Sequence, residues 1–153
     1  MDERELLRTV PLFSELNDDA ITSLGRLAAP RKYPKDTVVF FENEEGDSLF
    51  MIMDGRIKVT ILGDDGREII LTMLGEGDLF GEIAFFTEEG QRSASVRAMS
   101  DGQVLVLRRN FLKELTRDNP EAGFQILNNM GRVMAHRIMD LNHALLAARG
   151  AQR

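Results

Sequence analysis

The chain has 153 residues, of which 43% are hydrophobic and 29% charged, as expected for one globular domain with a sizeable core. Its formal net charge of −6 argues against a nucleic-acid surface, because phosphate backbones are bound by clustered lysine and arginine. The absence of cysteine excludes disulfides, thiol catalysis and cysteine-ligated iron–sulfur clusters. No window approaches eighteen apolar residues and the acidic start lacks an apolar signal core, so we expect a cytoplasmic protein without a membrane partner.

Residues 3–29 are predicted to form two short helices. Leu6, Leu7 and Val10 lie at helical spacing before Pro11 interrupts the pattern. Ser14 or Asn17 is positioned to cap the second helix. We expect this segment to pack onto a sheet rather than to carry chemistry.

From Lys32 to Arg108 the hydrophobic pattern changes to a period of about two. Short strands are predicted at 38–41, 49–53, 57–62, 69–74 and 104–107, separated by turns rich in glycine, aspartate and proline. Strands of this number and spacing predict a compact antiparallel barrel or jelly roll. Asp64, Asp65 and Glu68 raise the alternative of a calcium site, but their spacing lacks a calcium-loop ligand series and favours a hairpin turn.

The segment 75–97 reads GEGDLFGEIAFFTEEGQRSASVR and has the features of an anion site. Glycine before a short helix leaves the first N–H groups of that helix unpaired and facing one way. Arg92 supplies a permanently charged planar fork that suits phosphate oxygens, whereas Glu82 suits a hydroxyl donor. A phosphate beside a sugar hydroxyl satisfies both groups. The alternative is a surface ion pair of little energetic value, but the ordered combination favours a ribose phosphate site.

The stretch FGEIAFFTEEGQRSASVRA resembles the phosphate-binding cassette of the cyclic-nucleotide-binding domain family, which includes catabolite-activator-type regulators, kinase regulatory subunits and nucleotide-gated channels. The resemblance extends over nearly the whole chain. It implies that Glu82 binds the ribose 2′-hydroxyl, that Arg92 neutralises the cyclic phosphate and that Ser93 binds a phosphate oxygen or the base. Gly46 and Gly55 match glycines that the family uses at strand turns. The candidate ligand-binding residues are Gly81, Glu82, Ile83, Ala84, Arg92, Ser93, Ala94 and Arg137.

The last forty residues are predicted to be helical. Asn110 is placed to cap a first helix, and Asn119-Pro120 ends it and begins a longer one. A stripe along the long helix is either core or a dimer seam, and comprises Leu127, Met130, Met134, Ile138, Leu141 and Leu145. In catabolite-activator-type regulators this helix pairs with its copy, so the resemblance implies a homodimer.

Two departures from those regulators affect the functional expectation. The polar Thr-Ser pair that reads adenine is replaced by Arg137-Ile138, and Arg137 either contacts the purine or is a solvated helix residue. Ser93, rather than threonine, favours cyclic AMP over cyclic GMP within the family. The chain ends at Arg153 without a helix-turn-helix, so we expect no DNA binding by this chain.

His136 and His143 share a helix face, but without further ligands they predict packed or solvated residues rather than a metal or haem site.

The sequence therefore predicts an α+β, mainly β, single domain over 1–153: a helical lead-in (1–30), an antiparallel β-barrel or jelly roll (31–109) with the cassette at 75–97, and C-terminal helices (110–150). We expect a stand-alone regulatory domain that senses cyclic AMP or cyclic GMP and relays binding through its C-terminal helix. No cofactor, metal or catalytic residue is expected, because phosphodiester hydrolysis by Glu82 and Arg92 would need a metal-ligand cluster. The alternatives are a ligand-free scaffold of the same fold and a regulatory fragment of a larger channel, transporter or enzyme.

Overall fold

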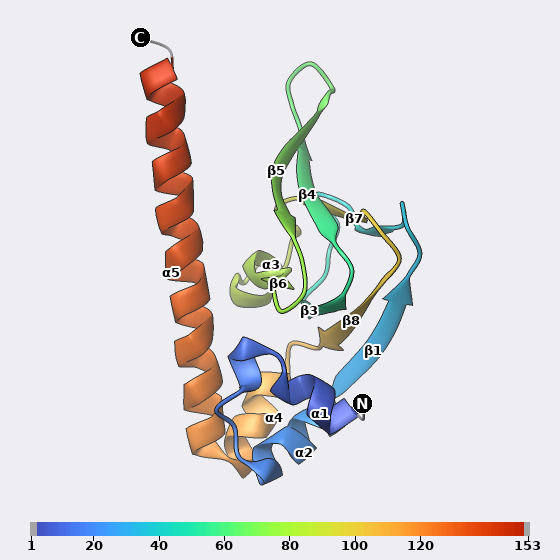
Figure 1. Cartoon of the computed structure of the whole chain (residues 1–153), viewed down its shortest axis with the longest axis vertical. Helices are drawn as coiled ribbons and strands as arrows, with labels where there is room; N and C mark the ends of the chain where they lie inside the picture. Colours follow the sequence, from blue (N-terminus) through green and yellow to red (C-terminus); the bar gives the residue numbers. More distant parts are fainter. Residues whose placement is uncertain (1–2, 152–153) are drawn as a thin grey trace.

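The computed structural model describes residues 3–151. Its helices are α1 (Glu3–Arg8), the 3₁₀ turn η1 (Pro11–Phe13), α2 (Asp18–Leu27), α3 (Glu82–Phe86), α4 (Phe111–Asp118) and α5 (Pro120–Ala151). Its strands are β1 (Ala28–Tyr33), β2 (Val38–Phe40), β3 (Leu49–Asp54), β4 (Ile57–Leu62), β5 (Glu68–Leu74), β6 (Leu79–Phe80), β7 (Ser95–Ala98) and β8 (Gly102–Leu107). Figure 1 shows the N-terminal helices and α4 gathered below the strands, with α5 along one side.

The strands form two four-stranded antiparallel sheets, in the orders β1-β8-β3-β6 and β2-β7-β4-β5. The predicted antiparallel jelly roll flanked by helices is thereby confirmed. Strand β1 was not predicted, because AAPRKY does not alternate and mostly faces solvent. Its backbone nevertheless pairs with β8 over six residues, from Ala28 opposite Leu107 to Tyr33 opposite Gly102. Tertiary pairing thus overrides a weak local pattern.

The segment between β4 and β5 is a hairpin turn, as predicted. Gly63 N donates to Arg67 O at 2.8 Å, and Gly66, with φ +78°, donates to Gly63 O at 2.9 Å. A positive φ favours glycine at this position. Glu68 pairs with Lys58 across the hairpin at 2.7 Å. The hairpin extends away from the rest of the sheet (Figure 1).

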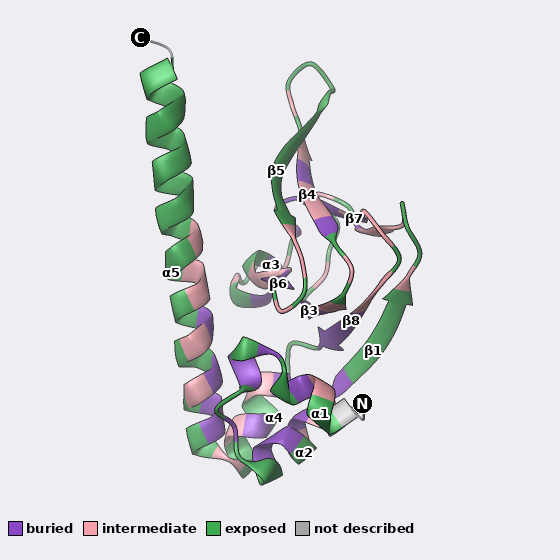
Figure 2. Cartoon of the chain, viewed as in Figure 1, coloured by how far each residue is buried: buried purple, intermediate pink, exposed green. Residues whose placement is uncertain are grey.

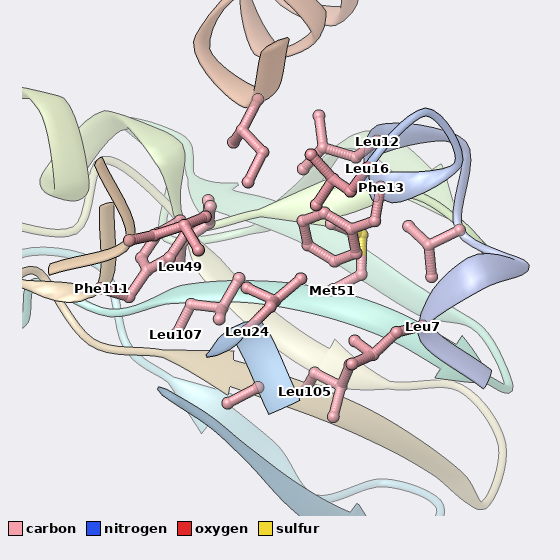
Figure 3. Close-up of a cluster of buried hydrophobic side chains, with 14 of the residues drawn as sticks. Leu7, Leu12, Phe13, Leu16, Leu24, Leu49, Met51, Leu105, Leu107 and Phe111 are labelled. Atoms are coloured by element: carbon pink, nitrogen blue, oxygen red, sulfur yellow. The ribbon is translucent and has the colours of Figure 1, made fainter. Parts of the chain in front are cut away.

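Alternation along β3 and β8 separates two hydrophobic clusters. Leu49 faces Leu107 and Met51 faces Leu105. These four side chains belong to the cluster that also contains buried residues of the helices (Figure 3). The intervening residues of the same two strands, among them Phe50 opposite Val106, belong to the cluster that also holds Phe40 and Phe80. Successive side chains of a strand point to opposite faces, so one strand pair holds both the helical layer and the second sheet.

Asparagine side chains cap the starts of α2 and α5. Asn17 Oδ1 accepts from Ala20 N at 2.9 Å, and Asn119 Oδ1 accepts from Ala122 N at 3.1 Å. Both bonds satisfy a donor that the helix leaves unpaired. The predicted cap at Asn110 is wrong: its backbone is already helical and its side chain makes no capping hydrogen bond.

Helix α5 has 32 residues, and its two halves differ in environment (Figure 2). Ala122, Gly123, Ile126 and Met130 are buried near its start. Farther along, the predicted stripe lies in solvent, with Ile138, Leu141 and Leu145 exposed by 59%, 65% and 56%. Within the stripe only Met130 is fully buried and Met134 packs partly against the core, whereas Leu127 is 45% exposed. Among the helices of residues 3–151, none has the length and apolarity needed to cross a membrane.

Candidate functional site

The candidate site is built around α3, where the chain leaves β6. Gly81 has φ +84°, a conformation that glycine adopts without strain, and α3 begins at the next residue, Glu82. The first bond of this helix runs from Phe85 N to Gly81 O at 3.3 Å. The N–H groups of residues 82–84 precede that bond and therefore have no acceptor within the helix.

Arg92 lies inward from the loop that follows α3 and is only 5% exposed. Its Nη1 donates to Ser48 O at 3.0 Å and to Gly81 O at 3.2 Å. Its guanidinium carbon lies 4.2 Å from the ring centroid of Phe40 and 5.5 Å from that of Phe50. The aromatic faces and the two carbonyls hold the guanidinium in one position by cation–π contact and hydrogen bonding.

The charge of Arg92 is not neutralised by a direct ion pair with any described residue. Both of its hydrogen bonds leave from Nη1. Nε and Nη2 make no hydrogen bond with a described residue, and neither atom is fully shielded from solvent. Burial lowers the pKa of Arg92, and the nearby carboxylates of Asp47, Glu44 and Glu82 oppose that shift. A guanidinium stays protonated despite such a shift. Arg92 is therefore a nearly buried cation whose Nε and Nη2 can still donate hydrogen bonds to a ligand.

Two glycines make room for this guanidinium. A Cβ at Gly46 would lie 2.9 Å from Arg92 Nε, and one at Gly81 would lie 3.0 Å from Arg92 Nη1. Gly46 was expected only to serve a strand turn, and its contact with Arg92 was missed. The glycine was visible in the sequence, but its partner lies 46 positions away.

The backbone of Arg92 is fixed by the segment that precedes β3. Arg92 N donates to Glu44 O at 2.9 Å, and Asn43 N donates to Arg92 O at 2.8 Å. Gly46 N then donates to Gly90 O at 2.9 Å. These hydrogen bonds place the loop of Arg92 directly beside the loop of Gly46. The segment that contains Gly46 therefore positions both the backbone and the guanidinium of Arg92.

Glu82 and Arg137 were both predicted site residues, and the structure brings them together. Arg137 Nη1 lies 3.1 Å from Glu82 Oε1, with the two side chains 26% and 17% exposed. Arg137 Nη2 also donates to Leu79 O. Glu82 Oε2 makes no ion pair or hydrogen bond with another described residue. Sequence reasoning considered Arg137 for a base and Glu82 for a sugar, and missed their direct contact.

The remaining candidate residues differ in accessibility. Ser93 is exposed next to Arg92, and Ile83 is 48% exposed on α3. Ala84 and Ala94 are buried, so only their backbones are available to a ligand. One further residue was not predicted: Arg109 donates to Thr87 O at 2.8 Å and to Ala84 O at 3.4 Å, which holds the end of α3 against β8 and α4.

Comparison with known proteins gives a family match over residues 30–119, to the family described as cyclic nucleotide-binding domain. The chain is 33% identical over 141 residues to the CRP-like cAMP-activated global transcriptional regulator of Mycobacterium tuberculosis, covering 92% of this chain and 61% of the relative. It is also similar to the structure of the Thermus thermophilus catabolite activator protein, at 31% identity and a TM-score of 0.73 over 90% of this chain and 63% of that one. A cyclic nucleotide-binding domain from Methylobacillus flagellatus shares the fold at 23% identity, with a TM-score of 0.77 over 89% and 76% of the two chains. This chain thus spans about three fifths of the curated mycobacterial relative.

Proposed function

This chain belongs to the cyclic nucleotide-binding domain family, and on that premise we propose that it is a regulatory sensor of a cyclic purine nucleotide, cyclic AMP in preference to cyclic GMP. The proposal assigns no catalytic step to the chain and no DNA contact to residues 1–153. The cyclic AMP preference is supported by Ser93 and by the name of the mycobacterial relative, a cAMP-activated regulator.

The observation that carries the proposal is the state of Arg92. A nearly buried cation without an ion-pair partner is costly, and an anion that reaches it removes that cost. The open donors Nε and Nη2 suit two oxygens of one phosphodiester group. The amides at the start of α3 lie beside the same guanidinium, since Gly81 O accepts from Arg92.

The ribose is assigned to Glu82. Arg137 binds one carboxylate oxygen of Glu82, and the other oxygen is open to a hydroxyl donor. In this arrangement Arg137 orients Glu82 and connects the nucleotide site to α5. Ser93 is exposed beside Arg92 and completes the contacts to the phosphate or the base.

We propose further that the chain forms a homodimer through α5 and relays nucleotide binding through that helix. Ile138, Leu141 and Leu145 lie on one stripe and are all more than half exposed. A second copy of α5 would cover this stripe by the two-fold symmetric pairing that is common among oligomers. A ligand that alters the Glu82–Arg137 contact would then act on the helix that joins the two copies.

Isothermal titration of the chain with cyclic AMP and cyclic GMP tests the sensor. The variant Arg92→Ala should lose about 2–5 kcal/mol of binding free energy, because it removes a charged partner from a desolvated phosphate. Arg26→Ala removes an exposed arginine of α2 that makes no ion pair with a described residue, and should bind as wild type. Circular dichroism checks that each variant is folded. If the folded wild-type protein binds neither nucleotide, the sensor proposal is refuted and the alternative of a ligand-free scaffold with the same fold remains.

Sedimentation velocity tests the dimer. Leu141→Glu places a charge on the proposed seam and should give a monomer, whereas Met139→Glu changes an exposed residue on the opposite side of α5 and should leave the dimer intact. A monomeric wild-type protein, or a dimer that tolerates Leu141→Glu, would contradict pairing through this stripe.

A further inference from the structure

A groove lies between α3 and α4, outside the proposed nucleotide site. Its volume is about 610 Å³, and its apolar part is formed by Phe85, Phe86 and Leu112. Arg109, Lys113 and Arg117 line the same groove. It is largely open to solvent rather than enclosed, which suits a peptide better than a small ligand.

The apolar part of the groove offers an aromatic anchor point. Phe85 is 7% exposed, and its ring lies 5.6 Å from that of Phe111 in the core. Phe86 packs edge-on against Phe85 at 4.8 Å and 81°, yet is 44% exposed. A large aromatic ring that is held by the core and still half-exposed is typical of residues that contribute strongly to protein interfaces.

The charged part of the groove is entirely basic. The chain as a whole has a net charge of −6, but the groove lining contains three cations and no Asp or Glu. Lys113 and Arg117 are exposed and make no ion pair with a described residue. They lie four residues apart, on one face of α4 and about 6 Å apart along its axis.

Arg109 has a different part in the same groove. It is occupied by the carbonyl oxygens of Thr87 and Ala84, so it fixes the end of α3 relative to α4. The spacing between the aromatic and basic sides of the groove is therefore set by a hydrogen-bonded contact. A preformed groove of this kind binds a partner at a lower entropic cost.

We propose that this groove docks a short acidic segment of a partner protein. One apolar side chain of that segment packs beside Phe86 and Leu112, and its carboxylates pair with Lys113 and Arg117. Charge complementarity favours an acidic occupant, because the groove lining contains three cations and no Asp or Glu. The proposal does not depend on nucleotide binding.

Chemical-shift mapping with the ¹⁵N-labelled full chain tests the docking. The probes are synthetic 16-residue helical peptides with one Leu or Phe anchor and Glu at every fourth position, and matched peptides in which Lys replaces Glu. Acidic peptides should shift the amides of residues 85–86 and 109–117, with an affinity that falls as salt is raised. The double variant Lys113→Glu/Arg117→Glu should bind at least about tenfold more weakly.

The control is Arg26→Glu/Lys32→Glu, which changes the net charge equally at exposed positions away from the groove and should bind as wild type. The proposal is overturned if the lysine peptides bind as well as the acidic ones, if the shifts lie elsewhere, or if charge reversal in the groove has no effect. It is also overturned if no acidic peptide binds, or if the groove variant instead abolishes self-association or binding to phosphatidylglycerol vesicles. Both double variants change exposed side chains, and their melting temperatures verify that the fold is retained.

Discussion

The variant Gly46→Ala should displace the guanidinium of Arg92 without removing it, and so tests whether the position of Arg92 matters for binding. An added Cβ at Gly46 would lie 2.9 Å from Arg92 Nε and 3.2 Å from Cζ, whereas ordinary van der Waals contact begins at 3.4 Å. The guanidinium must therefore withdraw by about half an ångström. It cannot keep its cation–π contact with Phe40 at 4.2 Å and both carbonyl hydrogen bonds while it does so.

The consequence for binding follows from the donors that move. Nε and Nη2 are the two groups proposed to bind phosphate oxygens, and both lie within 3.0 Å of the added atom. A hydrogen bond to a charged group is worth about 1.5–3 kcal/mol, so the loss of one such bond weakens binding about tenfold to a hundredfold. The backbone of Gly46 does not have a positive φ, so alanine introduces no backbone strain there. The loss of stability should therefore not exceed that of one charged hydrogen bond of Arg92, about 1.5–3 kcal/mol, and the variant should still fold.

Isothermal titration with cyclic AMP, together with thermal melting, measures both quantities. The matched control is Gly75→Ala, since an added Cβ at Gly75 meets nothing within 4 Å. For Gly46→Ala we expect weaker binding by a folded variant whose melting temperature is only modestly lowered, and for Gly75→Ala we expect no change in either quantity. Wild-type affinity in a folded Gly46→Ala variant, with Arg92→Ala inactive, would show that Gly46 does not position the arginine.

Two further predictions concern packing and pH. Gly123→Ala should destabilise the fold by roughly 1–3 kcal/mol in urea denaturation, because its Cβ would lie 2.8 Å from Cβ of Thr116 on the facing helix. Adding Thr116→Ala should restore part of the lost stability. If the effects of the two changes on the free energy of unfolding were fully additive, the clash would be refuted. The hydrogen bond from Lys58 lowers the pKa of Glu68 below its ordinary value of 4.5. Because the pKa of Glu68 is lower in the folded than in the unfolded chain, its contribution to stability is present above pH 4.5 and is lost as the pH falls through the folded-state pKa. A ¹³C titration should therefore give a lower pKa for Glu68 in the wild type than in Lys58→Ala.

Features that depend on neighbouring residues could be predicted from the sequence. The glycine turn before α3, the hairpin at Gly63–Gly66, the cap at Asn17 and the start of α5 at Pro120 each arise from a few adjacent residues. The jelly roll followed from alternation and turn spacing. β1 could not be predicted in the same way, since its strand geometry depends on pairing with β8, whose partner residues lie 69 to 79 positions away.

The geometry of the candidate site depends on contacts that no local pattern reveals. Ser48 O is 44 residues from Arg92, and Arg109 acts on Thr87 across 22 residues. Arg137 and Glu82 were each singled out, yet their ion pair depends on how α5 lies against the barrel. Residue types that favour a chemistry can thus be identified in the sequence, whereas the partner of each polar group requires the fold.

The charges of the proposed nucleotide site favour a monoanionic ligand. Glu82 is already paired with Arg137, so one positive and one negative charge cancel at 3.1 Å. Arg92 has no such partner among the described residues, and the carboxylates of Asp47 and Glu44 act on it only from a distance, with both side chains in solvent. Solvent screens those two carboxylates more strongly than it would screen an anion held against the guanidinium. A cyclic phosphodiester carries a single negative charge that pairs with Arg92, and it needs no counter-charge from Glu82 or Arg137. A ligand with two negative charges would leave one unpaired beside Glu82, which predicts that the open-chain nucleotide monophosphate binds more weakly than the cyclic form.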